Sequence, residues 1–546
     1  MQKKKLLSLA MAGVIAVSIF TGCTGKQQTQ TETKDGTKTG AQKVPEVNDK
    51  GAELKIHFHS NDKYTIVDAS GKLLPVFEKV QAATSYKITN VANPVATNST
   101  QEFQLQAAEQ FPADIYGGTS ISQEIMKYGM QGGFVPLNDL IDKYAPNLKK
   151  FLGEKPEVKK AITAPDGKIY YIPYIPDGGV ARTYFIRTDW LKDLNLQVPK
   201  TVEELEKVLI AFKEQDPNKN GKKDEIPYFN DKWEETIRLA NLWGARVYGN
   251  DSYAVRTVLD KDNKMYFAWT SNDFKDAIKN MARWYKMGLI DPEFVTRKAN
   301  TARQTLLTKE NRGGMTHEWV ASTSGYNENA ELLKIAPNFR FETFLPPSSP
   351  KGLGFEEHQR ITVKPDGWAI SSKSKNQTAA IRFMDYFFSP EGRQLANFGV
   401  EGISYDMKDG KPVFKEEALK AAGGTNKYLW EKLGAQLPIG YWQDYAYESQ
   451  WTNKFGLEGV KKYTDAKVII TNPTPVLNYN QEEKAVYDRV NSNLNTFCDE
   501  QIQKMIMGLI DVDSGWNNYI SEAKKLGVDD LVKAYQSAYD RVKSVK

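Results

Sequence analysis

Strand-like and helix-like segments alternate from about residue 53 onward. ELKIHFH at 53–59 alternates apolar and polar residues, the period of a half-buried strand; a helical pattern at 73–85 and a second strand-like segment, YKITNV, follow. Another helix, a proline break and a strand then lead to Gly117 and Gly118. This alternation predicts an α/β fold with a mainly parallel sheet covered by helices.

The loops that follow these strands are the first candidate binding residues. In sheets of this kind, ligands meet the loops beyond the carboxyl ends of the strands. His59 and Asn61 come at the end of the first strand, and Thr119 follows the later one. We therefore expect these three residues to contact a ligand.

The N-terminal segment resembles a secretory leader. Three lysines precede an apolar run from Leu6 to Phe20, which is too short for a membrane span. Thr21-Gly22-Cys23 resembles a bacterial lipobox, which predicts a signal peptide at 1–22, lipidation of Cys23 and attachment to the extracellular face of a Gram-positive cell membrane. Residues 23–51 are polar and predict a flexible tether. A plain signal peptide with an incidental cysteine is the alternative.

Composition excludes several classes of function. The formal net charge of +5 falls by the three lysines of the leader, and such a balance does not indicate nucleic-acid binding. The remaining residues are too many for one core and predict two lobes. The other cysteine, Cys498, lies in a helix-like stretch and is expected to pack as a small hydrophobe.

One polar loop has the residue types of a cation site. DPNKNGKKDEIPY at 216–228 follows a helix for which we expect Thr201 to be the N-cap. Hard oxygen ligands at alternate positions around a glycine are what Ca²⁺ requires. An EF-hand is excluded, because its twelfth position holds a glutamate and here it is Pro227. The alternative is an ordinary polar turn.

An ordered set of motifs resembles one family over nearly all of the chain after the tether. The motifs include FPADIYGG, GGFVPLNDLIDKYAPN, GKIYYIPY, YFIRTDWLKDLNLQVPKTVEEL, WYKMGLIDPEF, NRGGMTHEW, DGWAIS and FMDYFFSPEGRQLANFGVEGISY. They resemble the extracellular solute-binding proteins, family 1, which are lipoproteins of bacterial ABC importers that capture carbohydrates. The loop is similar to the calcium loops of the alginate-binding type within this family.

The resemblance implies a periplasmic-binding-protein-like type II fold, with two α/β lobes, hinge crossovers and a ligand cleft between the lobes. It implies a monomer with no catalytic role, which binds an oligosaccharide and delivers it to an ABC transporter permease. It assigns 52–178 plus 347–395 to the first lobe and 179–346 plus 396–546 to the second. It also implies a structural Ca²⁺ ion held by Asp216, Asn218, Asn220, the carbonyl of Lys222, Asp224 and Glu225.

Sugar sites pair aromatic rings with hydrogen-bonding side chains. The chain is rich in such rings, with 11 tryptophans and 27 tyrosines. The candidates on loop-like stretches or at the expected first crossover are Tyr174, Asp177, Trp243, Trp319, Arg360, Trp368, Tyr441 and Trp442. Arg182, Arg303 and Arg360 could pair with a uronate carboxylate, so neutral and acidic sugars both remain open.

Two alternatives to sugar binding remain at this point. A peptide-binding lipoprotein of the same fold would also use aromatic rings flanked by polar groups. A secreted glycoside hydrolase needs only two facing carboxylates, which no sequence motif reveals. Phosphate-loop and nucleophile-elbow motifs are absent from the sequence, which favours a protein that is not an enzyme.

Overall fold

The computed structural model describes residues 48–60, 65–93, 98–250, 255–297, 301–352 and 354–545. The leader, Cys23, most of the tether and the candidate Asn61 lie outside these residues. No helix within the described ranges is long and apolar enough to cross a membrane.

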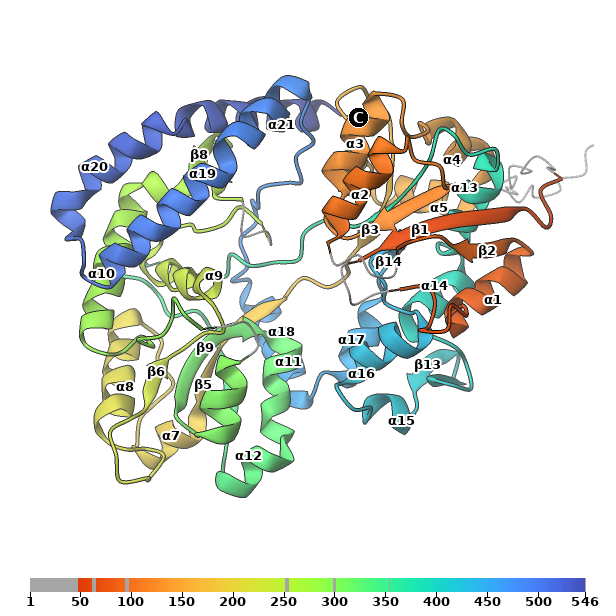
Figure 1. Ribbon diagram of the computed structural model, residues 1–546. Helices are drawn as coiled ribbons and strands as arrows, with labels where there is room; N and C mark the ends of the chain where they lie inside the picture. The colour runs from red at the N-terminus through yellow and green to blue at the C-terminus, as the bar shows by residue number, and fades with distance from the viewer. Residues whose placement is uncertain are drawn as a thin grey trace, which may run out of the picture. The chain divides into compact units, whose positions relative to one another are not determined.

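The first lobe is built on a six-stranded sheet in the order β14-β4-β11-β3-β1-β2 (Figure 1). The strands are β1 (Glu53–His59), β2 (Lys87–Asn90), β3 (Ile115–Gly118), β4 (Ile172–Ile175), β11 (Gly367–Ile370) and β14 (Tyr441–Trp442). β1 runs parallel to β2 and β3, and β14 runs parallel to β4. β11 lies antiparallel between β3 and β4, so the expected parallel sheet is interrupted by one reversed strand.

Helices cover this sheet and bury its apolar side chains. They are α1 (Pro75–Thr84), α2 (Ser99–Ala108), α3 (Ser122–Met130), α4 (Asn138–Tyr144), α5 (Pro146–Glu154), α6 (Pro156–Ile162), α13 (Gln377–Tyr386), α14 (Pro390–Phe398), α15 (Glu416–Leu419), α16 (Thr425–Tyr428) and α17 (Tyr445–Trp451). Alternate residues of β1, namely Leu54, Ile56 and Phe58, point into one continuous core. The predicted period of β1 is therefore confirmed.

The second lobe has a four-stranded sheet in the order β10-β5-β9-β6. Its strands are β5 (Arg182–Arg187), β6 (Ile226–Tyr228), β9 (Gly313–Trp319) and β10 (Phe341–Phe344), and a separate hairpin pairs β7 (Thr257–Leu259) with β8 (Met265–Phe267). β5 is antiparallel to both β9 and β10. A second core fills this lobe and contains Cys498, as expected for a buried small hydrophobe.

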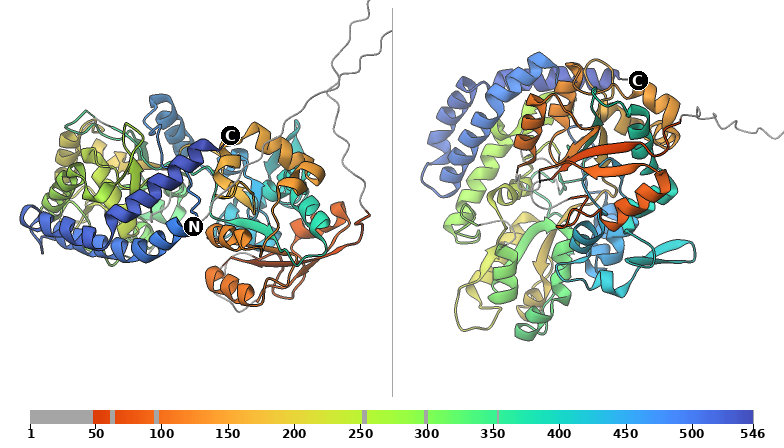
Figure 2. Two further views of the ribbon diagram at one scale, coloured as in Figure 1. Left: turned by 90° about the horizontal axis from the view of Figure 1, so that it is seen from above. Right: turned by 45° about the vertical axis from the view of Figure 1, so that its right-hand side comes forward.

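The helices of the second lobe include the longest ones in the described chain. They are α7 (Thr188–Asp193), α8 (Val202–Glu214), α9 (Trp233–Thr236), α10 (Asn272–Lys286), α11 (Val320–Ser324), α12 (Ala330–Ile335), α18 (Lys454–Ala466), α19 (Gln481–Ile506), α20 (Val512–Lys525) and α21 (Val528–Ser544). α19 packs along α21 and α10 (Figure 2). The predicted N-cap of α8 is confirmed, because the Thr201 hydroxyl accepts from the Glu204 amide at 3.2 Å.

Within the described residues, the chain passes between the lobes at three places. It leaves the first lobe after β4, returns to it before β11, and leaves it again between α17 and α18. The expected assignment of all of 396–546 to the second lobe is therefore wrong for its first part. Side chains from Ala396 to Tyr447 belong to the first core, since β14 pairs with β4 and draws the neighbouring segment with it.

Candidate ligand-binding site

The first group of candidate residues lies at the edge of the first sheet. Tyr174 of β4 and Tyr441 of β14 are direct neighbours in the parallel ladder, and their rings stack with centroids 5.1 Å apart. The Tyr441 hydroxyl donates to the Gln436 side chain at 2.9 Å, which fixes the inner ring. Tyr441 is wholly buried and Tyr174 is half-buried, so Tyr174 is the member of the pair with an accessible ring.

Asp177 ties the first crossover to the start of α17. One of its carboxylate oxygens accepts from the Gly178 amide at 2.8 Å, and the other accepts from the Tyr445 amide at 3.2 Å. The Asp177 amide itself points to the Gln443 side-chain oxygen at 3.5 Å. The Asp177 carboxylate is half-buried, and these contacts hold it in one orientation three residues after Tyr174.

Arg360 comes to the same place from the second crossover. Its Nη2 donates to both carboxylate oxygens of Glu448, at 2.6 Å for Oε2, and its Nη1 donates to Gln443 at 3.3 Å. The guanidinium lies 6.0 Å from the Tyr445 ring centroid. Because Glu448 neutralises it, Arg360 contributes N–H donors to this group without adding net charge.

A second group surrounds Trp319 at the end of β9. Arg182 of β5 lies directly opposite Trp319 in the antiparallel ladder, with its guanidinium carbon 4.3 Å from the ring centroid. The His358 ring meets the indole edge-on, with centroids 5.4 Å apart. The indole remains half-buried, which leaves part of the ring accessible.

Carboxylates balance the charge of Arg182 and Arg303 beneath this group. Arg182 Nη2 lies 2.6 Å from Glu235, and its Nη1 donates to Glu318 at 3.2 Å. Arg303 Nε donates to Asp231 at 2.8 Å. Burial raises the pKa of Glu318, and the nearby Arg303 and Arg182 charges oppose that rise.

The two crossovers run side by side and join these groups. Val180 and Gln359 form an antiparallel bridge, and the Arg360 amide points to the Gly179 carbonyl at 3.4 Å. The Val320 amide, next to Trp319, donates to the Ala181 carbonyl at 3.1 Å. One short segment therefore contributes to both groups. Arg360 belongs to the Tyr174 group, and His358, two residues earlier, belongs to the Trp319 group.

A third group lies at the carboxyl ends of β1 and β3, where the sequence predicts ligand contacts. His59 Nδ1 and the Thr119 hydroxyl both lie within hydrogen-bond distance of the Ser99 hydroxyl, at 3.2 and 3.1 Å. The next residue after Thr119, Ser120, has a positive φ of 58° and donates its amide to Asp366 at 2.9 Å. The Asp366 carbonyl accepts from the Tyr174 amide at 3.0 Å, which connects this group to the first.

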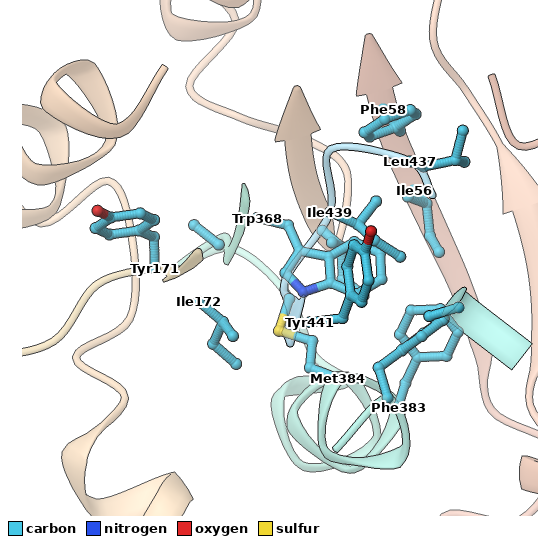
Figure 3. Packing of buried hydrophobic residues seen from close by; sticks show 14 of the residues in the cluster. Ile56, Phe58, Tyr171, Ile172, Trp368, Phe383, Met384, Leu437, Ile439 and Tyr441 are labelled. Carbon is cyan, nitrogen blue, oxygen red and sulfur yellow. The ribbon is translucent and has the colours of Figure 1, made fainter. Parts of the chain in front are cut away.

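The expectation that Trp368 contacts a ligand is wrong, because its ring has no exposed area. Trp368 belongs to β11, a central strand, and packs against Phe383 of α13 in the first core (Figure 3). Tyr441 is likewise wholly buried in this core and takes part only by supporting Tyr174. The Gly-rich sequence around Trp368 looked loop-like, but the glycine before it lets two strand backbones approach closely: a Cβ on Gly367 would lie 2.3 Å from the Ile172 carbonyl oxygen.

Trp243 also differs from the expectation, and Trp442, which is half-buried, lies apart from the Tyr174 stack. Trp243 ends a 3₁₀ helix, Ile237–Trp243, is 5% exposed and meets Trp284 edge-on in the second core. Trp442 follows Tyr441 on a two-residue strand, so its side chain points to the opposite face of the sheet. There it lies against Phe151 and Arg393, away from the Tyr174 stack.

Several residues of these groups could not be selected from the sequence. Gln443, Tyr445 and Glu448 follow the Tyr441-Trp442 pair closely, and that proximity was the one available signal. Arg182 was a sequence candidate only as a partner for a uronate, and His358 had no signal. Each lies beside Trp319 only through the pairing of β5 with β9 and the second crossover.

The polar loop after α8 folds around its own side chains. Amides of Asn220 and Gly221 donate to the Asp216 carboxylate at 3.0 and 2.9 Å, and the Lys222 amide donates to Asn220 Oδ1 at 2.8 Å. Asn220 Nδ2 donates to Asp224 at 3.0 Å. Glu225 is 4% exposed, and its Oε2 has no hydrogen-bond partner. Burial raises the pKa of Glu225, and the charges of Asp216 and Asp224 raise it further.

A cluster of three or more His, Cys, Asp or Glu able to hold a metal is not found within the described ranges. A cation bound in this loop would also need side-chain amide and main-chain carbonyl oxygens as ligands. The sequence of the loop supplies both. A buried carboxylate oxygen without a partner, beside two further acids, is a donor set that a hard cation would satisfy.

Two α/β lobes joined by paired crossovers, with half-buried rings and fixed polar groups along those crossovers, define a solute-binding protein of the periplasmic-binding type II fold. Residues 76–405 match the family described as "Bacterial extracellular solute-binding protein", and the chain belongs to this family. The members of this family bind solutes for transport and are not enzymes, as the sequence predicts.

Relatives with known ligands are found by sequence. The chain is 27% identical over 454 residues to the fructooligosaccharide ABC transporter substrate-binding protein FusA of Streptococcus pneumoniae serotype 4 (strain ATCC BAA-334 / TIGR4), covering 80% of this chain and 81% of FusA. It is 24% identical over 557 residues to the polygalacturonan/rhamnogalacturonan-binding protein YtcQ of Bacillus subtilis (strain 168), covering 98% of each.

Solved structures agree with this assignment. The alginate-binding protein AlgQ2, in a crystal structure without calcium ion, is 43% identical and matches with a TM-score of 0.78 over 90% of this chain and 99% of AlgQ2. FusA in complex with kestose is 23% identical and matches with a TM-score of 0.71 over 90% of this chain and 100% of FusA. The second match shows the shared fold.

Proposed function

We propose that this protein captures an oligosaccharide and delivers it to the permease of an ABC importer. The named functions of FusA, YtcQ and AlgQ2 all concern binding of a saccharide chain, and the name of FusA specifies an ABC transporter. These relatives support the ligand class, and the family supports the transport role.

The observation that carries the proposal is the arrangement along the paired crossovers. Tyr174 stands at one end and Trp319 at the other, and both rings are half-buried. Sugars present C–H faces that pack on such rings and hydroxyl groups that need fixed donors and acceptors. Asp177 supplies a fixed carboxylate and Arg360 a fixed set of N–H donors beside Tyr174.

The binding step follows from these positions. A sugar chain that contacts Tyr174, Asp177 and Arg360 in the first lobe and Trp319 in the second gains all its contacts only when both lobes engage it. Differential affinity of this kind shifts the population toward the closed state. The crossovers absorb the change in backbone angles, and the closed protein presents surfaces of both lobes to the permease.

Attachment to the membrane is part of the proposal. Lipidation of Cys23 and the polar tether at 23–51 would hold the protein, as a monomer, on the extracellular face of a Gram-positive cell membrane. The name of one further relative, lipoprotein LipO of Bacillus subtilis (strain 168), supports a lipid anchor; it is 26% identical over 405 residues.

The loop at 216–225 is proposed as a structural Ca²⁺ site. Asp216, Asn218, Asn220, the Lys222 carbonyl, Asp224 and Glu225 would hold the ion, and the unpartnered, buried Glu225 Oε2 supports this assignment. A bound ion would neutralise the clustered carboxylates and fix the loop that connects α8 to β6. The site serves the stability of the second lobe and has no direct part in sugar binding.

Calorimetry on the protein without its leader tests the function. Neutral oligosaccharides, oligouronates and short peptides are titrated separately, and the sugar recovered afterwards is analysed by mass spectrometry. Binding of at least one oligosaccharide, recovered intact, is the expected result. Binding of peptides alone would favour the peptide-carrier alternative, and shortened sugar products would contradict a pure binding role.

A further inference from the structure

Arginine guanidinium groups lie over tryptophan rings at several places in the described chain, and these pairs differ in how deeply the tryptophan is buried. Arg187 lies 4.2 Å from the centroid of Trp190, and Arg256 lies 3.8 Å from that of Trp269. Both of those indoles are fully buried core residues. Arg182 lies 4.3 Å from the centroid of Trp319, yet Trp319 is only half-buried. The same stack therefore occurs here with part of the ring left accessible, as it does at half-buried Trp442, whose ring centroid lies 3.6 Å from Arg393.

Arg182 is held at every nitrogen of its guanidinium group. It has no exposed area, and each of its three nitrogens has a partner. Nη2 pairs with Glu235 at 2.6 Å and Nη1 with Glu318 at 3.2 Å, while Nε donates to His358 Nε2 at 3.0 Å. A guanidinium fixed at three points presents its plane in a single orientation.

Trp319 is fixed from the other directions by the same partners. Its amide donates to Glu318 Oε2 at 3.1 Å, the carboxylate oxygen that also accepts from Arg182. His358, which accepts from Arg182, also meets the indole edge-on. The backbone, one face and one edge of Trp319 are thus defined by one connected set of buried groups.

We propose that Arg182 is a positioning residue that holds the Trp319 indole ready for a sugar. The proposal rests on the proposed function, because it assumes that Trp319 contacts the ligand. A ring held in its bound orientation loses little side-chain entropy on binding, so affinity rises without a new contact to the ligand. Arg182 itself is buried behind the ring and does not touch the sugar.

Arg182→Lys tests this role, because lysine keeps the charge for Glu235 and Glu318 but lacks the planar group that stacks on the indole. We expect the dissociation constant for the best oligosaccharide of the calorimetric panel to rise about three- to tenfold, the range that a cation–π contact supports. Arg187→Lys is the matched control. It lies on the same strand, stacks on buried Trp190 and pairs with Asp189, so it should lower the melting temperature without changing affinity.

A double-mutant cycle with Trp319→Ala separates positioning from general damage. If Arg182 acts through the indole, Arg182→Lys weakens binding in the wild-type background and has no further effect once Trp319 is alanine. An equal effect in both backgrounds overturns the proposal. If Arg182→Lys does not fold, Glu235→Gln, which keeps the shape but weakens the hold on Nη2, should give a smaller loss of affinity that again vanishes in Trp319→Ala.

The outcomes also distinguish this inference from the proposed function. No oligosaccharide binding by the wild-type protein overturns both. Oligosaccharide binding that is unchanged in Trp319→Ala leaves the proposed function in place and overturns the role of Arg182. Binding that is weakened by Trp319→Ala but unchanged in Arg182→Lys and Glu235→Gln overturns only the role of Arg182.

Discussion

The ring of Tyr174 lies parallel to that of Tyr441, with the two planes 12° apart. The pair joins residues far apart in sequence, because the two-residue strand β14 adds to the edge of the sheet next to β4. Tyr174 is the accessible member, and Tyr441 is the buried surface on which it rests.

Substitutions of Tyr441 should distinguish the contribution of its ring from the contribution of its hydroxyl. Tyr441→Phe keeps the stack and loses one hydrogen bond to Gln436, so we expect about 1 kcal/mol less stability and unchanged sugar affinity. Tyr441→Ala leaves a cavity under Tyr174 and should cost about 3–5 kcal/mol. Denaturant unfolding gives the stabilities, and calorimetry gives the affinities. Weaker sugar binding by Tyr441→Phe would show that the hydroxyl itself contacts ligand.

Trp319→Ala should mainly reduce sugar affinity, whereas Trp368→Ala should mainly reduce stability. Trp368 is wholly buried in the first core, so its truncation should lower stability by about 3–5 kcal/mol. Trp319 is partly accessible, so its loss should weaken sugar binding about tenfold or more with a smaller effect on melting. Thermal unfolding and calorimetry on both variants check this. A larger affinity loss for folded Trp368→Ala than for Trp319→Ala would reverse the assignment of the two rings.

Asp385 should make stability fall as the pH rises. Burial raises the pKa of this carboxyl from 3.8 to about 6 in the folded protein, although the Leu148 amide and Asn147 donate to it. Between about pH 4 and pH 6 the folded protein therefore binds the proton and the unfolded chain does not. By linkage, the carboxyl's contribution falls by about 3 kcal/mol across that range. Asp385→Asn should show a flatter stability profile; parallel profiles for the two proteins would contradict this.

Removal of calcium should lower the melting temperature without abolishing sugar binding below melting. An ion present at a hundred times its dissociation constant contributes about 3 kcal/mol. A chelator and Asp216→Ala should give the same loss, and the variant should no longer respond to the chelator. Asp511→Ala is the control, since Asp511 caps α20 by accepting from Ser514. It should lose about 1 kcal/mol and keep the chelator response. Equal chelator responses in Asp216→Ala and the wild-type protein would contradict the site.

Neutral sugars should bind more tightly than acidic ones of the same length. Each arginine that could receive a uronate is already paired: Arg182 with Glu235 and Glu318, Arg303 with Asp231, and Arg360 with Glu448. An acidic sugar would therefore find no excess positive charge at these arginines. Calorimetry with fructooligosaccharides and oligogalacturonates, at low and high salt, compares the two classes. Tight oligouronate binding that weakens with salt would refute this expectation.

The sequence predicted element types well and predicted the packing of rings poorly. The strand at 53–59 and the cap at Thr201 follow from local periodicity and local hydrogen bonding, and both are confirmed. Trp368 and Trp319 both follow polar or Gly-containing segments, so local sequence does not distinguish them. One is buried because β11 is a central strand, whereas the other ends its strand at a crossover.

Local sequence also did not reveal to which lobe each segment of the chain belongs. The segment from Ala396 to Tyr447 contains ordinary helices and a hairpin of β12 (Tyr405–Lys408) with β13 (Lys411–Phe414), which could pack on either sheet. Its place in the first core depends on the pairing of Tyr441 with Tyr174, a long-range contact that no local pattern encodes. The pairing of Arg182 with Trp319 was not visible in the sequence for the same reason.

Because β14 comes late in the sequence, the first sheet can be completed only late in synthesis. β2, at one edge of the sheet, is complete by Asn90, but the strand at the opposite edge is made only when the chain has reached Trp442. Until then, β4 presents an unpaired edge. The apolar residues of the first core that pack against the 396–447 segment also remain exposed to water. Such long-range pairing is slow and leaves aggregation-prone surface exposed. The newly made chain therefore cannot complete its first lobe until synthesis has passed Trp442.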